Sequence, residues 1–164
     1  MTVNSAPILG VVQVSPTSGY ALTTEFTINT LGWEDDVEDY PFRYEFFSRV
    51  DPNGESSSLR GLAEASDITG TLPNGLNSQN NIVEVITRVF DINNAAATAK
   101  TNAQVTVDPN AGSSATIAKN AINDISSFLE FADSDAVVRV VNNAAALLLS
   151  DLISTNTRRN RRLQ

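Results

Sequence analysis

The stretch NIVEVITRVFDI, residues 81–92, decides the fold because it is apolar on both of its alternating faces. One face carries three valines and the other carries two isoleucines and a phenylalanine: Val83, Val85 and Val89 against Ile82, Ile86 and Phe90. Successive side chains of a strand point to opposite sides of its sheet, so both sides of this strand need to be covered. The stretch therefore predicts a central strand.

Shorter strands, separated by turn residues, flank it on both sides. They are expected at residues 11–14, 25–29, 42–47, 59–65, 68–72 and 99–107. About seven short strands without helical periodicity predict a mainly β fold, an immunoglobulin- or fibronectin III-like sandwich over residues 6–109. The two weaker stretches, 59–65 and 68–72, are expected at sheet edges. Trp33, Tyr44 and Phe46 are the aromatic residues expected in the structural core.

The hydrophobic period changes after the turn at residues 108–112. Ser113 or Ser114 is a plausible helix cap, and Ile117, Ala121, Ile125 and Phe128 then recur at helical spacing. A second helix, capped within residues 132–135, carries Val138, Val141, Ala145, Leu148 and Leu152 in a three-four rhythm. The two helices predict a C-terminal α-helical hairpin over residues 114–153. Its apolar stripe needs a partner, either the sandwich or a neighbouring domain of the parent protein.

The last residues, 154–164, form a polar and basic tail that we expect to be disordered. Arg159, Arg161 and Arg162 fit a dibasic processing site of the secretory pathway. A solvated chain end and a contact with an acidic surface are the alternatives.

The composition argues against several classes of function. Cysteine and histidine are both absent, which removes disulfides, zinc–thiolate sites and the Ser-His-Asp arrangement. We therefore expect no catalytic residues and no organic cofactor. A net charge of −8 makes nucleic-acid binding improbable. No run of about 18 apolar residues is present, so we expect no membrane insertion by this segment.

One acidic loop offers hard oxygen ligands of the kind that calcium prefers. It contains Asp35, Asp36, Glu38 and Asp39, and Asp91 could join them if the strand ends converge. A calcium site is thus one interpretation and a solvated loop is another. Asp35 could instead cap the turn after Trp33, and a carboxylate pair for glycoside hydrolysis is also conceivable.

An ordered set of short motifs resembles the receptor-for-egg-jelly (REJ) module of the polycystin family. They are Val14-Ser15-Pro16 with Ser18-Gly19, Thr24 to Ile28 with Gly32-Trp33-Glu34-Asp35, Pro41 to Phe46, Leu72-Pro73-Asn74-Gly75, and Val83-Glu84-Val85 through Val89-Phe90-Asp91 and then Ala95 to Ala97. Together they cover about two-thirds of the chain. The chain departs from the family where it has Asn29 and Thr30 near a common cysteine position, and Asn93-Asn94 in place of a small turn residue.

The resemblance implies an extracellular or cell-surface, fibronectin-like module of a large membrane protein. Its expected function is non-catalytic recognition or adhesion. The partners would be a protein or glycan ligand at the cell surface and the neighbouring domains of the parent protein. The alternative is a structural spacer or assembly unit of a secreted matrix, coat or filament protein.

Overall fold

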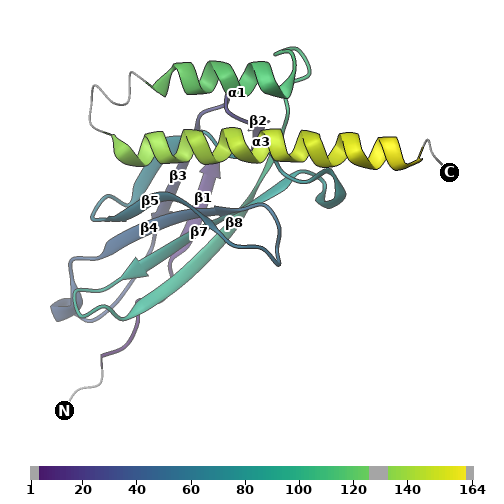
Figure 1. Cartoon of the computed structure of the whole chain (residues 1–164). Helices are drawn as coiled ribbons and strands as arrows, with labels where there is room; N and C mark the ends of the chain where they lie inside the picture. Colours follow the sequence, from purple (N-terminus) through teal and green to yellow (C-terminus); the bar gives the residue numbers. More distant parts are fainter. Residues whose placement is uncertain (1–3, 126–132, 162–164) are drawn as a thin grey trace.

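The computed structural model describes residues 4–125 and 133–161, with side chains as far as Leu152. Within this part of the chain, strands form two sheets and two helices follow them (Figure 1). The three-stranded sheet has the order β1 (Val11–Ser15), β3 (Phe26–Leu31), β6 (Asp67–Gly70). The five-stranded sheet has the order β2 (Ser18–Tyr20), β8 (Ala96–Thr106), β7 (Ile82–Phe90), β4 (Arg43–Arg49), β5 (Ser57–Ala63). The single-turn helices η1 (Val37–Asp39) and η2 (Asn77–Gln79) lie in connections.

The predicted central strand is confirmed. β7 lies between β8 and β4; it pairs antiparallel with β8 along its whole length and with β4 from Glu84 to Phe90. Val83, Val85 and Val89 are fully buried. The prediction that the two weaker stretches are edge strands is also confirmed, because β5 and β6 each end their sheet.

The two sheets share one apolar core. Its buried residues come from strands of both sheets and their connections: Val12, Val14, Ala21, Phe26, Ile28, Phe46, Leu59, Ile68, Leu72, Val83, Val85, Ala103 and Val105. The fold is thus mainly β with two sheets, followed by two helices. The immunoglobulin or fibronectin type of the sandwich stays a prediction.

Strand β2 was not among the predicted strands: it lies between the predicted strands 11–14 and 25–29, where only turn residues were expected. After β1 the chain turns at Pro16 and joins the other sheet, where Ser18 to Tyr20 pair in parallel with Gln104 to Thr106 of β8. Three residues that include a glycine carry too little alternation to be recognised as a strand.

Each helix begins at a residue that the sequence marked as a cap. The Ser113 hydroxyl accepts a hydrogen bond from Thr116 N (3.2 Å) at the start of α1 (Ser114–Asn123). Asp133 Oδ1 accepts one from Ala136 N (2.9 Å) at the start of α3 (Ser134–Arg161). The helices run antiparallel, side by side (Figure 1). Phe128 of the predicted first helix lies outside the described residues.

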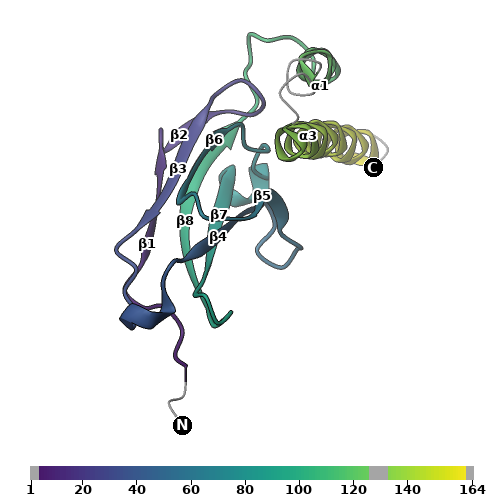
Figure 2. The same ribbon diagram turned by 90° about the vertical axis from the view of Figure 1, so that its left-hand side faces the viewer.

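Helix α3 lies along the edge of the five-stranded sheet (Figure 2). Arg139 Nη1 donates to Leu59 O of β5 (3.2 Å), and Asn143 Nδ2 donates to Thr71 O (3.0 Å). A second apolar cluster joins the helices to the strand region through Leu22: Leu22, Ile117, Ala118, Val140, Ala144 and Leu147.

Two features of α3 differ from the sequence prediction. The helix continues to Arg161, although we expected the hairpin to end at residue 153 and a disordered tail to follow. No glycine or proline follows Leu152 in the described helix, and extending an existing helix costs little. In addition, the stripe Val138, Val141, Ala145, Leu148 and Leu152 does not pack on the strands, because α3 turns its opposite face toward them.

Candidate functional site

Three of the five predicted acidic ligands meet where the connection from β3 to β4 approaches the turn after β7. Figure 1 shows these two segments at the end of the module that lies away from the helices. Asp35 follows β3, Asp39 ends η1, and Asp91 follows β7 directly. Each offers a carboxylate oxygen, and these oxygens all lie within 4.8 Å of one another. We call these three residues the acidic cluster. Asp36 and Glu38 are exposed and do not belong to it.

Hydrogen bonds fix two of the three carboxylates. Asp91 is fully buried, and its oxygens accept from Ala95 N (2.8 Å) and from Asn4 Nδ2 (2.7 Å). Asp39 Oδ1 accepts from Asn93 Nδ2 (2.6 Å). Asp91 therefore organises the turn between β7 and β8 while it faces the other two acids.

The third carboxylate is only partly satisfied. Asp35 Oδ1 accepts a hydrogen bond from Asp36 N (3.0 Å), which is the turn-capping role that the sequence left open. Asp35 Oδ2 is buried and has no hydrogen-bond partner among the described residues. A buried acceptor without a partner is costly, and a bound cation would satisfy it.

The environment of the acidic cluster raises the pKa of one of its members, Asp39. Burial raises the pKa of Asp39 above its ordinary value of 3.8, and the hydrogen bond from Asn93 opposes this rise. The negative charges of Asp35, Asp91 and Asp36 raise the pKa further.

Sequence reasoning missed the two asparagines of this site. Asn4 lies near the start of the chain, and Asn93 lies in the turn after β7. Asn93 could have been found, because asparagine next to an acidic residue in a hairpin turn commonly makes local side-chain hydrogen bonds. Asn4 reaches Asp91 across 87 positions of the chain, and no local pattern indicates such a contact.

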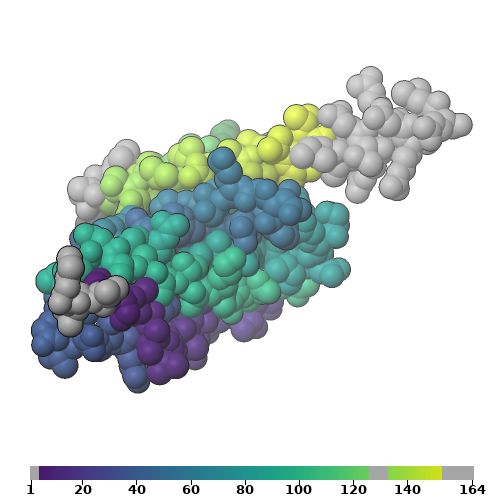
Figure 3. Space-filling model, turned by 90° about the horizontal axis from the view of Figure 1, so that it is seen from below, coloured from purple at the N-terminus to yellow at the C-terminus, as the bar shows by residue number. Residues whose placement is uncertain are grey.

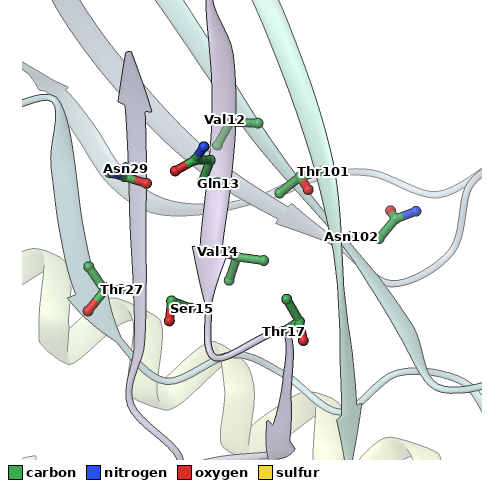
Figure 4. Close-up of a pocket in the computed structure, with 9 residues that line it drawn as sticks. All are labelled: Val12, Gln13, Val14, Ser15, Thr17, Thr27, Asn29, Thr101 and Asn102. Atoms are coloured by element: carbon green, nitrogen blue, oxygen red, sulfur yellow. The ribbon is translucent and has the colours of Figure 1, made fainter.

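A second candidate site is a polar groove between β1 and the free part of β8 (Figure 4). Its volume is about 440 Å³. The residues that line it carry no charge: Val12, Gln13, Val14, Ser15, Thr17, Thr27, Asn29, Thr101 and Asn102. We call it the amide groove. Because β2 pairs with β8 only as far as Gln104, it leaves the side chain of Thr101 open to the groove, whereas the Asn102 amide points to the other side of β8 (Figure 4).

The predicted core aromatics occupy three different environments. Phe46 is fully buried in the shared core, and Tyr44 is half-buried against it. Burial, and to a lesser degree Tyr40, raises the pKa of Tyr44. Trp33 lies outside the core cluster and covers Gly10, while its indole N–H donates to Thr30 Oγ1 (2.7 Å).

The predicted processing residues lie at the far end of α3. Arg159 and Arg161 are in its helical backbone, and Arg162 lies outside the described residues. Cleavage there would require the last turn of the helix to unwind.

Comparison with known proteins gives one family. The family model of the REJ domain matches residues 1–143, which includes every strand, α1 and the first turns of α3. No curated protein matches the chain. The family match confirms the resemblance that the ordered motifs indicated.

Proposed function

This chain belongs to the REJ domain family, and we propose that it is a non-catalytic extracellular recognition or adhesion module of a large polycystin-like surface protein. REJ domains are typical of such proteins and of egg-jelly receptors, and they occur in extracellular portions of receptors. No helix in the described part of the chain combines the length and the hydropathy of a membrane span. The family match over residues 1–143 carries the proposal.

The amide groove is the recognition surface that we propose. Gln13 and Asn29 offer both donors and acceptors, and Thr27 and Thr101 add hydroxyl groups. Uncharged amides and hydroxyls suit a ligand that is rich in hydroxyl groups and has no net charge. A neutral glycan of the cell surface fits this chemistry better than an anionic one.

Binding to immobilised neutral oligosaccharides tests this proposal. We expect the chain to retain a subset of them, and Gln13→Ala with Asn29→Ala to abolish that retention. Asn77→Ala is the matched control, because it removes an exposed amide in η2 away from the groove. Equal binding by the groove variant and the control would reject the groove as the recognition surface.

We also propose that the acidic cluster binds calcium. The observation that favours it is the buried, unpartnered Asp35 Oδ2 beside two further carboxylates. Carboxylate oxygens are preferred calcium ligands, and the neighbouring Asn4 and Asn93 amides could reorient to add carbonyl oxygens. The cation would be structural, because it would offset the mutual repulsion of the three acids.

Thermal unfolding with and without calcium tests the cation site. Extracellular modules bind calcium with dissociation constants of about 0.1 to 1 mM, so 10 mM calcium would stabilise the fold by about 1.4 to 2.7 kcal/mol. Asp35→Asn should lose this stabilisation, whereas Asp36→Asn, the same change on an exposed neighbour, should keep it. An unchanged melting temperature in the unsubstituted chain would end the proposal.

A further inference from the structure

Helix α3 carries a second apolar stripe on the side that faces away from the strands. Its members are Val138, Val141, Ala145, Leu148, Leu149 and Leu152, and we call them the outer stripe. The five larger residues leave 42% to 59% of their surface exposed. The opposite side of the helix is buried through Ala136, Val140, Ala144 and Leu147. A helix that is apolar on two opposite sides is typically covered on both, and the described chain covers one.

The figures show the outer side of α3 to be free. Figure 2 looks nearly along the helix, with the sheets on one side and α1 above it. The remaining side of α3 meets no other described segment there. In the space-filling view α3 lies along the margin of the molecule (Figure 3).

The spacing of the outer stripe identifies the kind of surface that fits it. Val138, Val141, Ala145, Leu148 and Leu152 alternate steps of three and four residues, which is a repeat of 3.5. This repeat is typical of a seam between two helices in a coiled coil, where side chains interlock with an equivalent row. We propose that the outer stripe pairs with the outer stripe of a second copy of this chain, in an antiparallel arrangement.

The charges at the start of α3 and its helix dipole select the antiparallel direction. The helix starts with Asp133 as its cap and Asp135 in its first turn. A parallel pair would place the two acidic starts and the like ends of the two helix dipoles together. An antiparallel pair separates the acidic starts and opposes the helix dipoles favourably.

The size of the surface sets the expected affinity. The 28 residues of α3 extend over about 42 Å, which is long enough for a two-helix seam. On dimerisation, one stripe of half-exposed side chains would bury less surface than the roughly 800 Å² per partner that a standard protein–protein interface buries. The dimer should therefore be weak, with a dissociation constant of roughly 1 to 100 µM.

Analytical ultracentrifugation of the full chain over a wide concentration range is the first test. We expect reversible conversion between 17.6 kDa and twice this mass. Leu148→Lys should weaken association at least tenfold. Leu31→Lys is the matched control, because Leu31 lies on β3 with 45% exposure against 42% for Leu148. A monomer at every concentration, or equal weakening by both variants, would overturn the proposal; far-UV circular dichroism checks that both variants remain folded.

Cross-linking tests whether the two helices pair antiparallel. Because the chain has no cysteine, an introduced cysteine is the only thiol that can react. An antiparallel seam places Val141 of one copy beside Leu152 of the other. A mixture of Val141→Cys and Leu152→Cys chains should therefore cross-link through a short bismaleimide, while Leu152→Cys alone should not. Efficient cross-linking of Leu152→Cys with itself would establish a parallel pair and overturn the antiparallel assignment. Neither test depends on the ligand of the amide groove.

Discussion

Gly10 shows how closely the backbone approaches an aromatic ring in this fold. A Cβ atom at this position would overlap the Trp33 ring, which the hydrogen bond to Thr30 holds in place. Thr30 Oγ1 in turn donates to Val11 O (2.9 Å), so the ring is fixed to β1 and β3 together. Trp33 of the Gly32-Trp33 motif therefore has a structural role in this chain: its indole covers the start of the three-stranded sheet.

We expect Gly10→Ala to destabilise the fold by about 1 to 3 kcal/mol, because the indole must move to admit the methyl group. Gly61→Ala is the control, since a Cβ at Gly61 in β5 meets no atom within 4 Å. Urea unfolding of the two variants measures the difference. Equal stabilities would show that Trp33 does not hold its position.

The acidic cluster makes stability depend on pH. The pKa of Asp39 is raised in the folded state, mainly by burial, so the folded chain holds this proton more tightly than the unfolded chain. Ionisation of Asp39 therefore costs stability. The cost begins as the pH rises through the unfolded value near 3.8 and is complete above the raised folded value.

Asp39→Asn should remove this cost. With a chelator present, the stability of the variant relative to the unsubstituted chain should rise between pH 3 and pH 7. Denaturant unfolding at both pH values measures it, with Glu38→Gln, a neutralised acid that is exposed and does not contribute to the raised pKa of Asp39, as the control. A relative stability that falls toward pH 7 would mean that ionised Asp39 is stabilising.

At the scale of elements, α3 is joined to the strands by polar contacts as well as by apolar ones. Asn143 is 2% exposed and donates to Thr71 O. Asn143→Ala leaves that carbonyl without its partner, which should cost about 1 to 3 kcal/mol. Asn142→Ala, one position along and exposed, should be close to neutral. Thermal unfolding followed by circular dichroism compares the pair, and equal effects would contradict the role of Asn143.

The strands and caps could be predicted from the sequence because their signals are local. β7 carries its alternation within nine residues, and Ser113 and Asp133 each lie within three residues of the amide that they cap. The inward face of α3 could not be predicted. Both faces of the helix are apolar at helical spacing, and periodicity alone does not say which one meets the strands.

The candidate sites were predictable to a similar extent. The acidic loop and Asp91 were identified from residue type, but only the fold separates Asp39 from exposed Glu38. The amide groove combines residues from β1, β3 and β8, which are far apart in the sequence. Its polar residues alternate with buried ones, as in any half-exposed strand, so nothing local distinguished them.

At the scale of the whole molecule, the two apolar clusters are unequal. The larger cluster contains buried residues of the strand region alone, whereas the smaller one combines buried residues of both helices with Leu22. We therefore expect residues 1–112 to fold cooperatively without the helices, and residues 113–164 to be largely unfolded alone. Circular dichroism and proton NMR of the two fragments test this. A fragment of residues 1–112 without a cooperative transition would show that the helices complete the fold.

The parallel pairing of β2 with β8 has a mechanical consequence. A pull on the chain before β2 and on the chain after β8 acts in opposite directions along two parallel strands, so it shears their hydrogen bonds together. Antiparallel neighbours under such a pull would open one bond at a time. Tension that reaches β2 and β8 in this way is therefore resisted by the short patch between Ser18–Tyr20 and Gln104–Thr106 as a unit.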